Sequence, residues 1–81
     1  MKLPRNVDGD NLARLLHCYG YCIDHQTGSH QRLTTTVNGK THDITIPRHR
    51  SLRVGTLHAI LKDVAARQKK DLNVIIRELF G

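Results

Sequence analysis

The chain has few of the residues that stabilise many small proteins by means other than an aliphatic core. Its 81 residues include no tryptophan, one phenylalanine and two tyrosines, so the core must consist mainly of leucine, isoleucine and valine. The two cysteines, Cys18 and Cys22, are too few for a disulfide scaffold or a zinc ribbon, and we expect reduced thiols. A domain this small leaves little room for a deeply buried active site, so any chemistry should take place on an exposed face or in a shallow groove.

Long apolar runs are also missing. No stretch approaches the roughly 20 apolar residues of a membrane span. The segment 1–5, Met-Lys-Leu-Pro-Arg, lacks the apolar run of a signal peptide. We therefore expect a cytoplasmic protein that does not bind a membrane.

Acidic residues are outnumbered by basic ones. There are 7 aspartates and glutamates against 13 lysines and arginines, which gives a formal charge of +6 and an isoelectric point near 9.9. This balance favours a polyanionic partner, either a nucleic acid or an acidic protein. It is equally compatible with a basic protein whose charge serves only solubility, so the net charge leaves the function open.

Apolar residues at helical spacing predict three helices. Asp8 is a candidate N-cap for the first helix, which ends at Gly20. A second helix begins near Val54, the polar link 67–70 follows it, and Asp71 caps a short third helix. The apolar faces of the three helices contain Leu12, Leu15, Leu16 and Tyr19, then Leu57, Ile60, Leu61 and Val64, and finally Leu72, Ile75, Ile76 and Leu79.

Three strands are predicted between the first two helices. They span residues 21–26, 29–37 and 41–46. Asn38-Gly39 is a strong hairpin signal, and Pro47 closes the last strand. Strands joined by short hairpins form an antiparallel meander, and helices before and after it would cover one face of the sheet. The prediction is a single α+β domain over residues 1–81, a two-layer sandwich with the architecture of a double-stranded-RNA-binding domain.

The segment Gly28-Ser29-His30, at the entrance of the second strand, is the main candidate for chemistry. Gly28 allows the positive φ that a tight turn often needs. Because side chains alternate along a strand, His30 and Arg32 should share the solvent face while Leu33 faces the core. An imidazole exchanges protons near neutral pH and an arginine binds phosphate, so the pair suits cleavage of a phosphodiester. His30 would act as general acid or base, with Ser29 and Arg32 contacting RNA.

Two further residues could support His30, because one imidazole cannot accept and donate a proton at the same moment. If Ile23 faces the core, Asp24 lies on the solvent face with His30 and Arg32. Its carboxylate would then either orient His30 or form a surface ion pair with Arg32. His49 could be a second proton donor, a phosphate ligand or an ordinary loop histidine.

The loop after the third strand is strongly basic. Arg48, Arg50 and Arg53 precede a helix N-terminus that contains Gly55 and Thr56. Exposed amides and the helix dipole favour an anion there, so we expect a phosphate-binding site for RNA. A solvated basic loop without a ligand is the alternative.

Six histidines raise the question of a metal site. The sequence contains neither a His-x-His pair nor a helical pair linked to a glutamate. We therefore expect no metal and no other cofactor. We expect the remaining four histidines to be structural or solvent-facing: His17, His25, His42 and His58.

Several motifs stand in a distinctive order along the chain. They are Lys2-Leu3-Pro4-Arg5, Gly20-Tyr21, Gly28-Ser29-His30, Ile44-Thr45-Ile46-Pro47 followed by His49, and Gly55-Thr56-Leu57. In this order and spacing they resemble the HicA toxins of bacterial toxin–antitoxin systems, over residues 1–66. Residues 67–81 form a more charged link and a longer final helix than that family's pattern. The resemblance implies a double-stranded-RNA-binding-like fold, ribosome-independent cleavage of mRNA, a neutralising HicB-like antitoxin, and a catalytic role for the histidine of Gly-Ser-His, which is His30.

Three functions therefore stand side by side. The first is a metal-independent endoribonuclease toxin that acts through His30. The second is a non-catalytic RNA-binding module with the same basic face, and the third is a domain that docks an acidic protein. Charge and fold suit the first two equally, and only the exposed His30 with its neighbours favours the enzyme.

Overall fold

The computed structural model describes residues 3–37 and 39–81, so Lys2 of the first motif and Asn38 of the predicted hairpin lie outside it. The elements in chain order are α1 (Gly9–Leu15), the 3₁₀-helix η1 (Leu16–Tyr19), β1 (Cys22–Gln26), β2 (His30–Val37), β3 (Lys40–Pro47), α2 (Val54–Gln68) and α3 (Leu72–Phe80). The strands form an antiparallel sheet in the order β1-β2-β3. The predicted α+β class and the three-stranded meander are confirmed.

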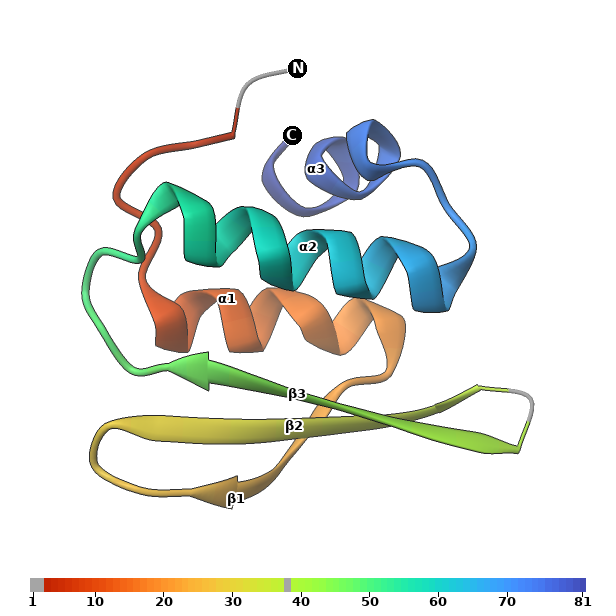
Figure 1. Cartoon of the computed structure of the whole chain (residues 1–81), viewed down its shortest axis with the longest axis horizontal. Coiled ribbons are helices and arrows are strands. Elements are labelled where there is room, and N and C mark those ends of the chain that lie inside the picture. Colours follow the sequence, from red (N-terminus) through yellow and green to blue (C-terminus); the bar gives the residue numbers. More distant parts are fainter. Residues whose placement is uncertain (1–2, 38) are drawn as a thin grey trace.

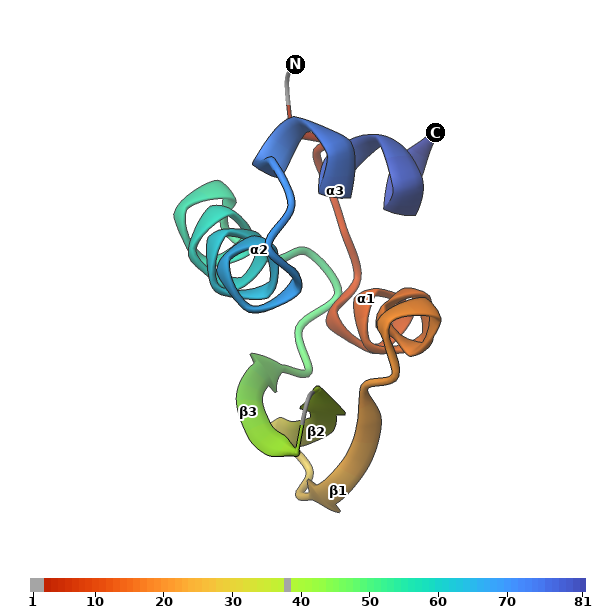
Figure 2. The same cartoon turned by 90° about the vertical axis from the view of Figure 1, so that its right-hand side faces the viewer.

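The helices cover one face of the sheet, but they do so in two tiers (Figures 1 and 2). The first tier is α1 and α2, which lie side by side above the strands. The second is α3, which lies on the far side of that pair and away from the sheet. Its buried residues Ile75, Ile76 and Leu79 join the same apolar core as the sheet and the other helices. The double-stranded-RNA-binding-like sandwich thus carries an additional helix on its outer surface.

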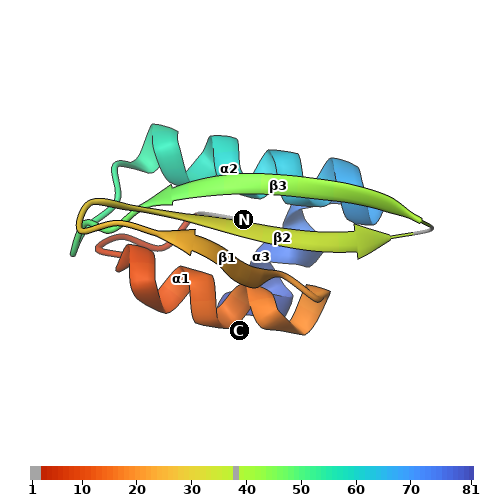
Figure 3. The ribbon, with the colours of Figure 1, turned by 90° about the horizontal axis from the view of Figure 1, so that it is seen from below.

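Alternation along β2 matches the prediction. Gln31, Leu33 and Thr35 are buried, whereas His30 and Arg32 are exposed. The pattern follows from the period of two in a strand with one face on the helices. The other sheet face is left to solvent, as Figure 3 shows from below.

The predicted inward position of Ile23 is wrong. Ile23 pairs with Leu33 in the ladder, yet it is 44% exposed, while Leu33 is fully buried. All five residues of β1 are exposed, so the helices do not cover this strand, whereas the other edge strand, β3, buries both of its isoleucines. The buried side chain of Tyr21, just before β1, contributes to the core instead. A bulge between Ile23 and His25 makes Asp24 the extra residue of the edge strand.

Helix ends follow local signals in most places. The carboxylate of Asp8 accepts hydrogen bonds at the start of α1, and Asp71 does the same for α3. The first helix ends as a 3₁₀ turn and stops at Gly20, whose φ of 84° lies in the left-handed region. The predicted link 67–70 is shorter than expected, because α2 continues through Gln68.

A close approach between α1 and β3 positions one end of the molecule. A β-carbon on Gly9 would lie 2.0 Å from the carbonyl oxygen of Pro47, so only glycine fits there. The Gly9 N–H donates to the carbonyl oxygen of His49 at 2.9 Å. The start of α1 is thereby attached to the end of β3, beside the β1–β2 turn.

Candidate functional site

The β1–β2 turn is organised by the side chain of Thr27. Its hydroxyl oxygen accepts the N–H of His30 at 3.0 Å and that of Ser29 at 3.3 Å. The Thr27 N–H donates in turn to the carbonyl oxygen of His30 at 2.8 Å. Gly28 does not use the positive φ that a glycine allows, since its φ lies outside the left-handed region. A threonine hydroxyl that bonds the backbone two and three residues ahead shapes the turn instead, a known role of threonine that the sequence prediction overlooked.

His30 is exposed at the first position of β2, where it pairs across the sheet with Pro47. Its Nδ1 lies 2.9 Å from the hydroxyl oxygen of Ser29. A hydroxyl can donate or accept, so Ser29 can accommodate either tautomer of the ring. Among the residues that the structure describes, nothing else hydrogen-bonds the ring, which leaves Nε2 accessible for proton transfer.

Asp24 pairs with Arg32. The guanidinium donates through Nε at 3.1 Å and Nη2 at 2.6 Å to a single carboxylate oxygen, and both side chains are 49% exposed. Of the two roles considered for Asp24, the structure contains the surface ion pair. The ring of His30 is oriented by Ser29 rather than by this carboxylate. Arg32 remains half exposed beside His30 on the same strand face.

Arg48 is turned toward the protein. Its Nε and Nη2 donate to the two carboxylate oxygens of Asp10 at 3.1 and 3.3 Å, and its Nη1 donates to the carbonyl oxygen of Thr27 at 2.8 Å. Its backbone N–H donates to the carbonyl oxygen of Ser29 at 2.8 Å. These Arg48 hydrogen bonds are the main reason that the pKa of Asp10 is held below its usual value. Arg48 therefore links α1, the β1–β2 turn and the end of β3.

Asp10 and Gln31 belong to this cluster, although the sequence did not single them out. Gln31 is 2% exposed, and its amide donates to Asp10 at 3.0 Å and to the carbonyl oxygen of Gly9 at 3.3 Å. Its position in the strand was a usable signal, because alternation places Gln31 on the buried face and a buried amide needs partners.

The rest of the basic loop is open to solvent. Arg50, Arg53 and His49 have exposed side chains, and no side chain caps the N-terminus of α2. No acidic residue lies in the first turn of α2, and a β-carbon on Gly55 would contact nothing within 4 Å. Thr56 is half-buried in the same turn. The loop and the β1–β2 turn lie at the same end of the molecule in Figures 1 and 3.

The other histidines lie apart from this end or face solvent. His42 connects sheet and helix, with Nδ1 at 2.8 Å from the Tyr21 hydroxyl and Nε2 at 3.3 Å from Asp63. Burial, with a smaller contribution from Asp63, raises the pKa of Tyr21 to about 12. His17, His25 and His58 are exposed. Within residues 3–37 and 39–81 no cluster of three potential metal ligands occurs, and no helix there is long and apolar enough to cross a membrane.

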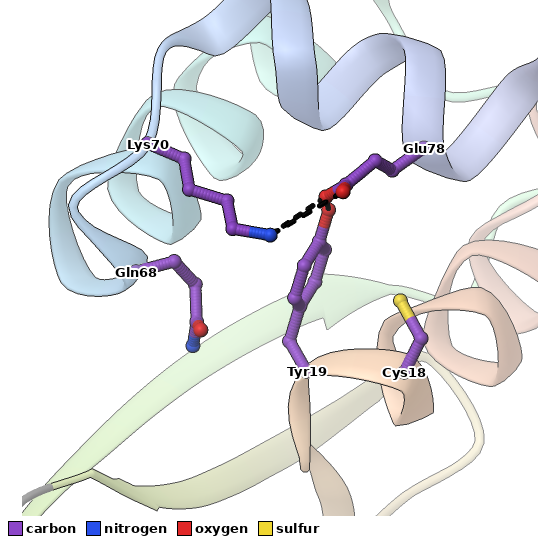
Figure 4. Close-up of a pocket in the computed structure, with 5 residues that line it drawn as sticks. All are labelled: Cys18, Tyr19, Gln68, Lys70 and Glu78. Carbon is purple, nitrogen blue, oxygen red and sulfur yellow. Dashed lines mark hydrogen bonds and ion pairs between the residues drawn. The ribbon is translucent and has the colours of Figure 1, made fainter.

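A second polar cluster lies away from His30, where α3 meets the end of η1 (Figure 4). The Tyr19 hydroxyl donates to Glu78, and the Lys70 ammonium donates to the same carboxylate at 3.0 Å. Cys18 and Gln68 complete the lining of an open pocket of about 490 Å³. Cys18 and Cys22 are both reduced and exposed. The pocket shares no residue with the His30 end, and its ion pair attaches α3 to the core.

The protein is a small basic α+β domain whose fold is like that of double-stranded-RNA-binding domains. It has an exposed histidine, His30, where β2 begins. The family model described as HicA toxin of bacterial toxin-antitoxin matches residues 9–65, and the chain belongs to this family of toxins. The resemblance seen in the sequence is thereby confirmed, and the match ends before α3. Searches of curated proteins and of solved structures return no significant match.

Proposed function

We propose that the chain is a metal-independent endoribonuclease that cleaves mRNA, with His30 as a general acid or base. The observation that carries the proposal is the environment of His30: an exposed imidazole whose Nδ1 is bonded by Ser29 and whose Nε2 faces solvent. Membership of a toxin family supports a damaging activity, and mRNA as the target would place that activity in the cytoplasm.

The reaction can be written without a metal. Nε2 of neutral His30 accepts the proton of a ribose 2′-hydroxyl, and the 2′-oxygen attacks the adjacent phosphorus. The bond from phosphorus to the 5′-oxygen breaks, and that oxygen takes a proton from a second donor, which is water, the substrate or His49. The products are a 2′,3′-cyclic phosphate and a 5′-hydroxyl, and protonated His30 then releases its proton to water, from which the second donor recovers its own.

Phosphate groups would be held by the exposed cations at this end. Arg50 and Arg53 lead into the uncapped N-terminus of α2, where the amides of the first turn around Gly55 and Thr56 can donate to an anion. Arg32 is half exposed next to His30, which suits a contact with the scissile phosphate. The hydroxyl of Ser29 can donate to the ring and still accept a hydrogen bond from a ribose hydroxyl of RNA.

As a member of a toxin–antitoxin family, the chain has an antitoxin partner. We place a HicB-like antitoxin over the face of His30 and Arg32, because an acidic surface there would compete with phosphate for the same cations and associate rapidly. Hydrogen exchange on the complex tests this placement. Protection at β2 and the β1–β2 turn supports it, and protection confined to the helices would contradict it.

The second candidate is an RNA-binding module without catalysis, which the same exposed basic loop would serve. Replacement of His30 by alanine separates the two, because an exposed side chain leaves no cavity in the core. We expect His30→Ala to lose at least about 100-fold in cleavage rate with an unchanged circular dichroism spectrum. His17→Ala, at an exposed position of η1, is the matched control and should cleave like the parent. Equal cleavage by parent and His30→Ala would remove His30 from the mechanism.

A further inference from the structure

The guanidinium of Arg48 bonds both Asp10, in the first turn of α1, and the Thr27 carbonyl oxygen, in the β1–β2 turn that precedes His30. We propose that Arg48 and Asp10 form a positioning pair that fixes the orientation of His30, and that Arg48 is not a phosphate ligand of the basic loop. The inference rests on the proposed function of His30. It separates Arg48 from Arg50 and Arg53, with which the sequence groups it.

All three nitrogens of this guanidinium already have protein acceptors. Nε and Nη2 are directed at Asp10, and Nη1 at the carbonyl oxygen of Thr27. The Arg48 side chain is 26% exposed, against 49% for Arg32. The planar fork of arginine suits such fixed bonding to two partners, and it leaves only two of the five N–H donors for a phosphate.

These bonds lead directly to His30 through the turn. The Thr27 carbonyl accepts from Arg48, while the Thr27 hydroxyl accepts the backbone N–H of His30. On the other side of Gly28, the Ser29 carbonyl accepts the backbone N–H of Arg48, and the Ser29 hydroxyl bonds the imidazole. Gly28 adds no side-chain contact of its own. The turn is therefore held from within by the Thr27 hydroxyl and from outside by Arg48, and a shift of Arg48 would disturb both residues that orient His30.

Asp10 connects the same pair to the buried side of β2. Its carboxylate accepts from Arg48 and from the amide of Gln31, which directly follows His30 in the strand. The ion pair is partly exposed, so its contribution to stability is small. Its geometric effect is larger, because misplacing a catalytic group by about 1 Å can cost 100-fold in rate.

The two possible roles of Arg48 predict opposite effects for Asp10→Asn. If Arg48 binds phosphate, removal of the negative charge releases a guanidinium for RNA, so RNA binding tightens and cleavage at low RNA concentration rises. If Arg48 positions His30, the rate at saturating RNA falls although the protein becomes more positive. Arg48→Lys distinguishes them again, because lysine keeps the charge but cannot bond both Asp10 and Thr27 as the guanidinium fork does.

The experiment measures kcat and KM for RNA cleavage with Asp10→Asn, Arg48→Gln and Arg48→Lys. We expect kcat to fall 10- to 100-fold in all three and KM to stay within about twofold. Glu78→Gln is the matched control, a carboxylate of similar exposure that pairs with a cation at the other side of the molecule, and it should leave kcat unchanged. A raised KM with unchanged kcat in Arg48→Gln, or a faster Asp10→Asn, would overturn the inference.

Amide hydrogen exchange of Ser29 and His30 in the RNA-free protein tests the positioning separately from catalysis. We expect faster exchange at both amides in Asp10→Asn and Arg48→Gln, and parent-like exchange in Glu78→Gln. Unchanged exchange in the first two variants overturns the inference even if the enzyme is active. If the turn loosens as expected but His30→Ala still cleaves RNA, the proposed function fails while the structural link between Arg48 and the turn holds.

Discussion

Gly9 and Pro47 are in contact through their backbones, and a β-carbon on Gly9 would lie 2.0 Å from the Pro47 carbonyl oxygen. This approach brings the first turn of α1 to the end of β3, and with it Asp10 to Arg48. The end of the molecule that contains His30 therefore depends on a glycine that has no role in the proposed chemistry itself.

We expect Gly9→Ala to destabilise the fold by about 1–3 kcal/mol, because the added carbon can be accommodated only if α1 moves away from β3. Urea unfolding measures the loss. A free energy of unfolding equal to that of the parent would show that α1 and β3 can separate without cost.

Gly55 provides the opposite case, because a β-carbon there meets nothing within 4 Å. Gly55→Ala should leave the fold unchanged or stabilise it by up to about 1 kcal/mol, since alanine favours helix. The same variant should weaken RNA binding if a phosphate approaches the first-turn amides of α2 closely. Fluorescence anisotropy with labelled RNA is the measurement, and parent-like affinity would move the phosphate away from this helix end.

The basic loop should determine how RNA affinity responds to salt. Arg50→Gln and Arg53→Gln should each reduce the slope of log affinity against log salt by about 1, because each removes a contact that releases counterions. Arg48→Gln should change the slope little, since its guanidinium already bonds Asp10 and Thr27. Lys40→Gln, at the far end of β3, is the control. Equal slopes for Arg50→Gln, Arg53→Gln and the parent would contradict a phosphate role for this loop.

Acid should loosen the attachment of α3. Hydrogen bonds from Tyr19 and then from Lys70 lower the pKa of Glu78 from its ordinary 4.5. A lowered pKa means that the stabilisation is present above about pH 4.5 and is lost as the pH falls through the value in the folded protein. The melting temperature of Glu78→Gln should lie below that of the parent at pH 6, and the difference should narrow as the pH falls below 4.5. A difference that stays constant as the pH falls would contradict this account of Glu78.

Local signals in the sequence predicted much of the fold. The carboxylates of Asp8 and Asp71 cap their helices, and alternation along β2 separated His30 from Leu33 correctly, since both effects act between near neighbours. Ile23 could not be placed in this way, because its exposure depends on whether the helices cover β1, and all five residues of β1 are exposed. An apolar residue in an alternating pattern does not reveal whether a helix covers it.

The candidate site was predictable in part. The exposed position of His30 followed from the alternation of side chains along the strand. The ion pair between Asp24 and Arg32 was one of the two roles for Asp24 that the strand pairing allowed. The ion pair between Arg48 and Asp10 could not be predicted from the sequence, because the two residues are 38 positions apart in the chain and come together only through tertiary packing. In the sequence Arg48 is one of three arginines in a loop, and only the fold separates it from Arg50 and Arg53.

The most direct test of the central claim is RNA cleavage by the purified protein in excess EDTA, with an all-ribose oligonucleotide and its 2′-O-methyl counterpart. Attack by the 2′-hydroxyl with proton transfer through His30 requires that hydroxyl and no metal. The account predicts that the parent cleaves the ribose strand in EDTA to a 2′,3′-cyclic phosphate end, that the methylated strand stays intact, and that His30→Ala cleaves neither. Cleavage that stops in EDTA, or that proceeds on the methylated strand, would contradict it.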